Sequence, residues 1–258
     1  MNIKFSIIIP TLNSEKTIKK CISSVIHQSY RNWEIIIVDA SSNDLTFKIL
    51  KKFKIKKKFF YFKSKLKKGL AYDRYIGISK SKGNYVCFLD SDDSWLKNKL
   101  LNQYNLIIKQ NAKFMCSNYI LNFKKKKLYS SFKNVSTDYH NSLSNRFISN
   151  SSVAVNRKEI LKVAKKFNAN IMAEDYLWWL LLLKNHFKRC YIINSHDVVI
   201  NYSVNSRTTK ITSHFRSLIY IYNKILRIPL YKVIYHFCIL SLNTFKKNLF
   251  KLKLLINV

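Results

Sequence analysis

The stretch FSIIIPTLNSEKTIKKCISSVIHQSYRNWEIIIVDA, residues 5–40, decides the fold class. Residues 5–9 and 33–38 are mostly β-branched, apolar runs that end at Pro10 and Asp39, as expected of strands buried on both faces. Between them, residues 15–28 place apolar side chains on one stripe at helical spacing. A strand, a helix and a second strand joined by short connections predict a parallel, doubly wound sheet.

The same alternation continues along the chain. Further strands are predicted at residues 59–62 and 85–89, and further helices at residues 44–54 and 70–80. The second half is less regular, and its predicted elements are a helix at 97–111, a hairpin at 113–129 turning around the lysines 124–127, a strand at 147–155, and helices at 158–167 and 174–185.

Polar residues follow three of the predicted strands. They are Pro10 to Asn13, Asp39 to Ser42, and Asp90 to Asp93. In doubly wound sheets ligands bind outside the carboxyl ends of the strands, so the three segments are expected to meet in one crevice.

The third of these segments, DSDD, is unusual for this composition. The chain holds 13 acidic residues against 47 basic ones, and three of the acids stand within four positions. Hard cations such as Mg²⁺ and Mn²⁺ prefer oxygen ligands, and Mg²⁺ is commonly held by one or two carboxylates together with substrate phosphates. Asp90 and Asp92 are therefore candidate metal ligands. The alternative interpretation is a solvated turn that caps a helix beginning near Leu96.

The net charge of +34 bears on the partners. Of the basic residues, 39 are lysines and only 8 are arginines, whereas phosphate clamps and base readers favour arginine. We therefore expect an anionic membrane surface rather than nucleic acid as the partner of this charge, because lysines near such a surface gain about 1 kcal/mol each.

Cysteine usage and the N-terminus bear on the compartment. The five cysteines include no CxxC pair, and an odd number of widely spaced thiols fits reduced, buried side chains in a cytosolic protein. The apolar run near the N-terminus is five residues long, too short for a signal peptide.

Residues 210–258 differ in character from the rest, mixing lysines with aromatic and aliphatic residues. Pro229 is expected to separate two helices. The most apolar window, 228–242, contains Lys232 and His236 and falls short of the roughly 20 apolar residues that a membrane-spanning helix needs. An amphipathic helix lying in the membrane interface fits this composition, and the alternative is a pair of helices that closes the core.

Three stretches carry a resemblance to a known family. FSIIIPTLNSEKTIKKCISSVIHQSYRNWEIIIVDASSND, KKGLAYDRYIGISKSKGNYVCFLDSDD and MAEDYLWWLLLL resemble, in order and spacing, a family 2 glycosyltransferase with the GT-A fold. The resemblance covers residues 1 to about 205. It implies an α/β fold with a mostly parallel central sheet flanked by helices, followed by a C-terminal helical tail. It also implies inverting transfer of a sugar from a nucleotide-sugar donor, assisted by Mn²⁺ or Mg²⁺.

The resemblance also implies a division of the chain. Residues 1–209 form the glycosyltransferase domain, with a nucleotide-binding half at 1–95 and an acceptor half at 96–209, and residues 210–258 form the basic tail.

The family's functional residues carry over to particular positions. Asp90 and Asp92 match the DxD motif, Asp92 as the metal ligand, and Asp175, next to Glu174, matches the general base that deprotonates the acceptor hydroxyl. We assign Asp175 and Glu174 as catalytic and Asp92 and Asp90 as metal ligands. The residues assigned to the donor nucleotide are Thr11, Asn13, Glu15, Asp39, Arg74, Asp90 and Ser91.

Two positions depart from the family pattern. Ala40 replaces the second acid of the usual DDGS, which in some members reads uracil, and Tyr75 replaces the Asn of the ARNxGI segment that includes Arg74 and Gly77. The donor base is open for this reason, and a UDP-sugar is favoured. The segment 69–73, GLAYD, resembles a branch of the family that builds bacterial surface polysaccharides.

Several other side chains have two interpretations each. Lys67 and Lys68 could touch a diphosphate or be solvated, and Arg207 could lie on a loop over the donor. His196 could be a ligand or structural, and the Trp178–Trp179 pair could belong to the core or touch the acceptor.

The sequence therefore predicts a metal-dependent inverting glycosyltransferase, peripheral on the cytoplasmic face of the membrane, acting on a glycan or lipid-linked acceptor in bacterial surface polysaccharide synthesis. The alternative is a non-catalytic basic module that binds membrane or nucleic acid. A nucleotidyltransferase is disfavoured, because PTLNSEKT, residues 10–17, lacks a glycine-rich basic loop.

Overall fold

The computed structural model describes residues 2–42, 45–53, 58–64, 66, 68–123, 126–132, 135–165, 171–202 and 211–256, with side chains described for all of these except 211–214 and 244–256. The strands are β1 (Phe5–Thr11), β2 (Trp33–Asp39), β3 (Phe59–Lys63), β4 (Tyr85–Phe88), β5 (Ser94–Trp95), β6 (Phe114–Phe123), β7 (Lys126–Tyr129), β8 (Ser136–Thr137), β9 (Ala154–Asn156) and β10 (Cys190–Asn201). The helices are α1 (Ile18–Ile26), α2 (Leu45–Leu50), α3 (Leu70–Lys80), α4 (Lys99–Gln110), α5 (Tyr139–Ser144), α6 (Arg157–Ala164), α7 (Glu174–Asn185), α8 (Ile211–Tyr220) and α9 (Leu230–Ile256), with a 3₁₀ turn η1 (Asn150–Ser152) and a π-helical turn η3 (Ile221–Ile225).

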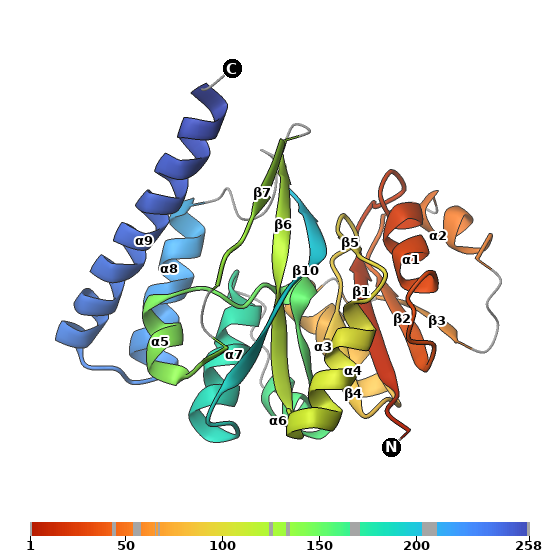
Figure 1. Ribbon diagram of the computed structural model, residues 1–258, viewed down its shortest axis with the longest axis horizontal. Coiled ribbons are helices and arrows are strands. Elements are labelled where there is room, and N and C mark those ends of the chain that lie inside the picture. Colours follow the sequence, from red (N-terminus) through yellow and green to blue (C-terminus); the bar gives the residue numbers. More distant parts are fainter. Residues whose placement is uncertain are drawn as a thin grey trace.

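A single sheet in the order β3-β2-β1-β4-β9-β6-β10-β5 runs through the molecule (Figure 1). The β3-β2-β1-β4 part is wholly parallel, as predicted for a doubly wound sheet. Beyond it the sheet is mixed, since β9 runs antiparallel to both β4 and β6, while β10 is parallel to β6. The main strands β1, β4, β6 and β10 therefore point toward the same end of the molecule.

Helices cover both faces of the sheet. In β1, Phe5, Ile7 and Ile9 pack with α1 and α4, whereas Ile8 points to the opposite face and packs with α3, α6 and α7. This alternation is the period-two geometry of a strand buried on both sides. Gly77 lets α3 approach β1 closely, because a Cβ atom there would overlap the Ile8 side chain.

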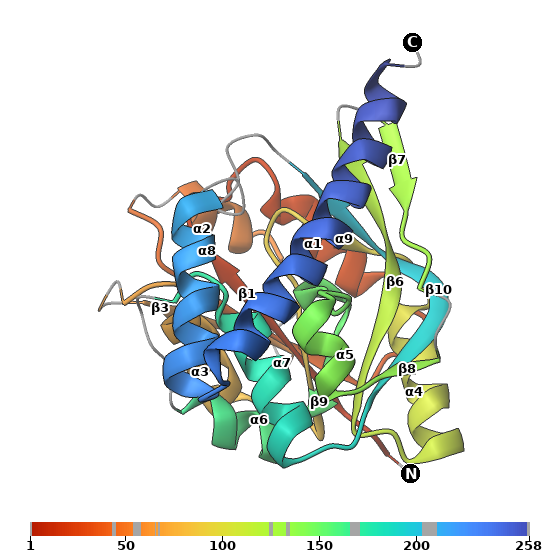
Figure 2. The same ribbon diagram turned by 90° about the vertical axis from the view of Figure 1, so that its left-hand side faces the viewer.

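Helix α7 is apolar on both sides because it has two neighbours. Trp178 and Trp179 face the sheet, while Tyr176, Leu177 and Leu180 join a second core with the turn η3 and α9. A helix that is hydrophobic all round is normally buried, and here the C-terminal helices complete that burial. Figure 2 faces this side and shows α9 crossing in front of α5 and α7.

The C-terminal helices are joined to the domain by specific polar contacts as well. The Tyr176 and Tyr222 hydroxyls lie 2.7 Å apart, and both donate to the carbonyl oxygen of Leu143. His236 Nδ1 lies 2.7 Å from Ser144 Oγ. The predicted break at Pro229 is confirmed, since α9 begins at Leu230. The part of the tail up to Leu240 therefore closes a core, which was the alternative interpretation.

No helix among the described residues is both long and apolar enough to cross a bilayer. The opposite face of the tail remains exposed. Of the fifteen large apolar side chains that the described residues expose, eight lie between Phe215 and Leu242.

Most predicted elements are present within a few residues, and the hairpin at 113–129 is confirmed as the antiparallel pair of β6 and β7. The strand predicted at 147–155 is wrong over most of its length. Residues 150–152 form η1, and only residues from Ala154 onward join the sheet, because the polar side chains of Asn150, Ser151 and Ser152 turn into the protein instead of following a strand. Strand β10 was not predicted, because Asn194, Ser195, His196 and Asp197 interrupt its apolar pattern where its pairing with β6 shifts register.

Candidate active site

The three polar segments after β1, β2 and β4 meet, as predicted. Ser14 Oγ lies 2.8 Å from Ser91 Oγ, which joins the first segment to the third. The Asn13 N–H donates to Ser41 Oγ at 2.8 Å, which joins the first to the second. The carboxyl ends of the parallel strands therefore form one crevice, in the position that doubly wound sheets use for ligands.

Asp39 organises the wall of this crevice. Its Oδ1 accepts from Thr11 Oγ1 at 2.9 Å and from the Ser41 N–H at 3.0 Å, and its Oδ2 accepts from the Tyr61 hydroxyl at 2.8 Å. Burial opposes its charge, but the hydrogen bonds from Ser41, Tyr61 and Thr11 outweigh burial and lower the pKa of the carboxyl. Asp39 is fully buried, so it is a fixed negative charge under the surface of the crevice.

Asn13 and Glu15 line the opening of the crevice. Asn13 is exposed and has a positive φ of 49°, and its Oδ1 accepts from the Ser42 N–H at 3.1 Å. Glu15 has one buried carboxylate oxygen, Oε2, that bonds no other described group. Buried polar atoms are rarely left without a partner in folded proteins, so this oxygen is available to a ligand.

The DSDD acids lie in a turn beyond the end of β4 and not within a strand. Asp90 Oδ1 accepts from Arg74 Nη2 at 2.6 Å and from Asn150 Nδ2 at 3.1 Å. Asp92 is exposed, and its pKa is raised by partial desolvation and then by the negative charge of Asp90. Asp93 is 5% exposed and points away from the crevice.

Arg74 is the central cation of the site. Its guanidinium pairs with Asp90 and with Glu174, whose Oε1 lies 2.7 Å from Nη1, and both Arg74 and Glu174 have side chains that are 4% exposed. Desolvation opposes the positive charge, but the charges of Asp90, Glu174 and Asp175 outweigh it and raise the pKa of Arg74. One buried side chain therefore joins Asp90 of the DSDD turn to the start of α7, where the predicted base lies.

The two acids at the start of α7 have different surroundings. Asp175 is half-buried, and its Oδ1 accepts from the Tyr176 N–H at 2.8 Å. Glu174, predicted as catalytic together with Asp175, is locked in the buried ion pair with Arg74. An ion-paired carboxylate is a weaker proton acceptor, so Glu174 is suited to holding Arg74 rather than to taking a proton.

The residues present fit a divalent cation. Three carboxylates, Asp90, Asp92 and Asp93, stand within four positions, and Arg74 pairs with Asp90. The pKa values of both Asp92 and Asp93 are raised by burial and by their acidic neighbours. Within the described residues no group of three or more His, Cys, Asp or Glu side chains is arranged as a metal site. A cation here would therefore rely on Asp92, Asp90 and the phosphates of a donor.

The structure decides between the two interpretations for some of the remaining side chains. Trp178 and Trp179 are 1% exposed core residues, and His196 Nε2 contacts the Ser130 carbonyl oxygen at 2.7 Å. Lys68 lies over the Tyr72 ring at 5.6 Å. Lys67 and Arg207 lie outside the described residues.

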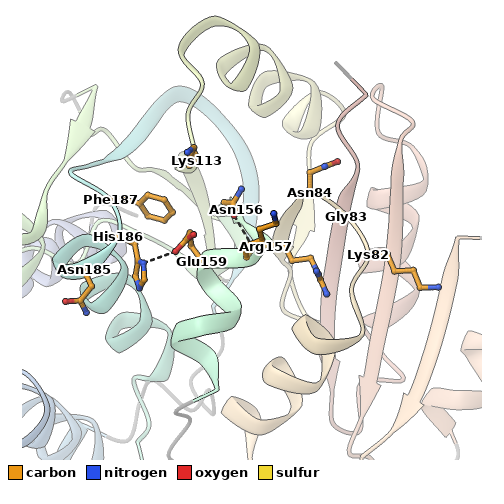
Figure 3. A pocket seen from close by; sticks show the side chains of 11 residues that line it. Lys82, Gly83, Asn84, Lys113, Asn156, Arg157, Glu159, Asn185, His186 and Phe187 are labelled. Atoms are coloured by element: carbon orange, nitrogen blue, oxygen red, sulfur yellow. Dashed lines mark hydrogen bonds and ion pairs between the residues drawn. The ribbon is translucent and has the colours of Figure 1, made fainter.

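A cavity of about 750 Å³ lies at the other end of the sheet, where β4 begins (Figure 3). Its lining includes Lys82, Lys113 and Arg157 but none of the predicted site residues, and its acid, Glu159, pairs with His186 at 2.8 Å and with Lys162. The acids of the crevice are thus separate from this basic cavity.

Residues 6–164 match the model of the family Glycosyl transferase family 2. The chain belongs to that family. This glycosyltransferase is 34% identical over 189 residues, 70% of each chain, to the Escherichia coli UDP-Glc:alpha-D-GlcNAc-diphosphoundecaprenol beta-1,3-glucosyltransferase WfgD. It is 30% identical to the putative teichuronic acid biosynthesis glycosyltransferase TuaG of Bacillus subtilis, over 95% of this chain and 97% of that protein.

Solved structures confirm the GT-A-like fold. The crystal structure of S. aureus TarS 1-349 in complex with UDP-GlcNAc superposes with a TM-score of 0.73 over 92% of this chain and 70% of that one, at 20% identity. The predicted family, a family 2 glycosyltransferase of bacterial polysaccharide synthesis, and the predicted fold class are therefore confirmed.

Sequence reasoning missed several residues that build the site, namely Ser14, Ser41, Tyr61, Asn150, Ser151 and Asn201. A signal for two of them was visible. The run Asn150-Ser151-Ser152 is polar on consecutive positions, which a half-buried strand is not. Asn201 had none, because its position depends on the pairing of β10, a strand that was not predicted, with β6.

Proposed function

We propose that this glycosyltransferase moves a sugar from a UDP-sugar to a hydroxyl of a glycan or lipid-linked acceptor with inversion, in bacterial surface polysaccharide synthesis. Asp175 is the general base. Asp92, with Asp90, holds Mn²⁺ or Mg²⁺, and Thr11, Asn13, Glu15 and Ser91 line the donor site. The relatives support a UDP-sugar, since WfgD is named for UDP-Glc and TarS crystallised with UDP-GlcNAc.

The observation that carries this proposal is the pair of bonds made by Arg74. Its guanidinium lies 2.6 Å from Asp90 on the metal loop and 2.7 Å from Glu174, which precedes Asp175. Arg74 would thus fix the position of the acids near the donor phosphates relative to the acid near the acceptor hydroxyl. Such fixed positioning is a large part of how enzymes lower barriers.

The chemistry follows from these positions. Asp175 accepts the proton of the acceptor hydroxyl as its oxygen attacks the anomeric carbon of the donor sugar. The new C–O bond forms on the face of the sugar opposite the diphosphate. At the same time the bond between the anomeric carbon and the diphosphate oxygen breaks, and the UDP leaves with the electron pair. A bound divalent cation would act as a Lewis acid on the diphosphate oxygens. Displacement in one step inverts the anomeric configuration.

A test compares acid-to-amide changes. We expect Asp175→Asn to bind UDP-sugar as the wild type does and to lose transfer by about 10³-fold, because an amide cannot take a proton and general bases typically contribute 10²–10⁴-fold. The assay measures UDP release with an acceptor that carries diphosphate-linked N-acetylglucosamine, the group in the name of WfgD. Glu159→Gln, an acid remote from the crevice, is the matched control. Wild-type turnover by Asp175→Asn would contradict the assignment.

The alternative of a non-catalytic binding module predicts no metal-dependent change in stability with a nucleotide-sugar. An enzyme with ligand at 100 times its Kd gains about 2.7 kcal/mol of unfolding free energy. Thermal unfolding with UDP-glucose, with and without Mn²⁺, separates the two. Nucleic acid is not expected to shift the unfolding midpoint.

We also propose that the enzyme works as a peripheral protein on the inner face of the cell membrane, where a lipid-linked acceptor lies. The exposed face of α8 and α9 supports this location. It carries Tyr220, Leu230, Tyr231, Ile234 and Tyr235, each more than 40% exposed. Tyrosines favour the headgroup level, and aliphatic side chains favour the acyl boundary.

Charge favours an anionic membrane over a second copy of the chain as the partner of this face. No acidic residue follows Asp197, while residues 211–258 hold eight lysines and arginines, so two such faces would repel each other.

A further inference from the structure

The third acid of the DSDD segment, Asp93, is not used by the chemistry above. Both of its carboxylate oxygens already have protein donors. Oδ2 accepts from Ser151 Oγ at 2.6 Å, and Oδ1 accepts from the Asn201 N–H at 3.0 Å. Asp93 is 5% exposed, whereas Asp92, its neighbour, is exposed to solvent.

The two partners of Asp93 also hold the loop at its other residues. Ser151 Oγ accepts from the Asp90 N–H at 3.1 Å, and Asn201 Nδ2 donates to the Asp92 carbonyl oxygen at 2.6 Å. Four hydrogen bonds from two residues thus fix the backbone at Asp90 and at Asp92, with the Asp93 carboxylate between them.

The partners are themselves anchored in the second half of the chain. Trp95 Nε1 donates to the Ser151 carbonyl oxygen at 2.8 Å, and Gln103 Nε2 donates to the Ser152 carbonyl oxygen at 3.0 Å. Lys99, fully buried, donates to the Val153 carbonyl oxygen at 3.3 Å. The turn η1 is therefore a stiff support and not a mobile loop edge.

We propose that Asp93 is a positioning residue: through Ser151 and Asn201 it clamps the loop so that Asp90 and Asp92 present their carboxylates to the cation. This inference rests on the metal site of the proposed function. It separates the three acids by role, since two face the cation and the third fastens their backbone to η1 and to the end of β10. Residues that orient metal ligands are typically worth 10–100-fold in metal affinity.

A pair of substitutions distinguishes a clamp from a third ligand. In Asp93→Asn, the side-chain oxygen can still accept from the Asn201 N–H, and the amide can donate to Ser151 Oγ, so the clamp is kept. In Asp93→Ala it is lost. A metal ligand would be damaged by both changes, because an amide is a poorer ligand for a hard cation than a carboxylate.

The measurement is the affinity for Mn²⁺ with saturating UDP, by electron paramagnetic resonance or calorimetry, with no transfer reaction required. We expect Asp93→Asn to stay within about threefold of wild type, and Asp93→Ala and Ser151→Ala to weaken binding by about 10–100-fold. Asp92→Asn, a change at a proposed ligand, should weaken Mn²⁺ binding as well. Unfolding midpoints without metal identify any variant that has lost its fold, and Ser151→Ala removes the same clamp from the other side.

Two results would overturn the proposal. One is a loss of Mn²⁺ affinity in Asp93→Asn as large as in Asp92→Asn, which would make Asp93 a ligand. The other is wild-type Mn²⁺ affinity in both Asp93→Ala and Ser151→Ala. Wild-type protein that binds UDP without Mn²⁺ would instead remove the metal from the proposed function, and this inference with it.

Discussion

The crevice and the C-terminal helices use charge in opposite ways. In the crevice, Asp39, Arg74 and Glu174 are almost fully buried, and each is held by partners at 2.6–3.0 Å. Residues 211–258 contain no acid, and Arg216, Lys224, Arg227 and Lys232 are exposed among their described side chains, together with three tyrosines. Each buried charge contributes a strong interaction with its own partner, whereas exposed charges contribute weakly and their effects add up over the surface. Single substitutions should therefore have large effects in the first region and small ones in the second.

The largest effect on stability is expected at Arg74. In Arg74→Met, Glu174 is left buried without its cation, and breaking a buried pair in this way costs about 3–5 kcal/mol of unfolding free energy. Urea unfolding measures the cost. The exposed Arg189, changed in the same way, should cost less than about 0.5 kcal/mol.

A second variant sharpens this prediction. Arg74→Met/Glu174→Gln should recover part of the loss, because a neutral amide is cheaper to bury unpaired than a carboxylate. If the unfolding free energy of Arg74→Met lies within about 1 kcal/mol of the wild-type value, the buried ion pair does not stabilise the crevice. Single substitutions would then not have larger effects there than on the C-terminal helices.

On the tail, a single change should have a modest effect on binding to anionic vesicles. Ile234→Ser removes an exposed isoleucine from α9 and should weaken binding about fivefold, since about 1 kcal/mol of apolar transfer is lost. Ile108→Ser, on α4, makes the same change on another exposed helical face and should have no effect.

Cys238 provides the probe for this measurement. It is exposed on α9 while the other four cysteines are buried, so an environment-sensitive fluorophore attaches there alone. We expect a blue shift with vesicles containing phosphatidylglycerol and none with phosphatidylcholine or in high salt. No shift with either lipid, or dimers in sedimentation without vesicles, would show that something other than a membrane covers this face.

The smallest expected effect is a pH dependence of the packing of α9 against α5. Burial, His140 and Lys232 lower the pKa of His236 below its usual 6.5, so His236 is neutral while it contacts Ser144. The unfolded chain then binds more protons, and stability falls as the pH drops through about 6.5 toward the lower folded pKa. His236→Gln should flatten the stability profile between about pH 7 and 5.5, measured by thermal unfolding, whereas His27→Gln, on the far side of the sheet, should not.

The first half of the chain was predictable because local pattern and tertiary role agree there. Residues 5–9 and 33–38 are buried on both faces, so continuous apolar runs reported their strands directly. The second half was harder because its residues serve distant partners. Asn150 and Ser151 are polar because they bond to Asp90 and Asp93. Their consecutive polar positions argue against a strand, but nothing local identifies these distant partners.

The same contrast applies to the site. Asp90, Asp92, Arg74 and Asp175 came from motif positions, and the structure brings Asp90 and Asp175 close to Arg74. Which acid would be ion-paired and which half-exposed depended on packing between elements 100 residues apart, as in the Arg74–Glu174 pair. A spacing pattern in one sequence carries no information on that.

The two-sided burial of α7 has a consequence for modularity. Its first residues carry Glu174 and Asp175, one side packs on the sheet, and the other is completed by Leu218, Tyr222 and Val233 of the C-terminal helices. A chain cut before α8 would expose the apolar side of α7 directly behind Glu174 and Asp175. The same helices, joined to another catalytic domain, would expose the apolar side chains that pack against α7 here. A junction at residue 210 is therefore unfavourable for exchanging domains, because it divides the core that α7 shares with the C-terminal helices.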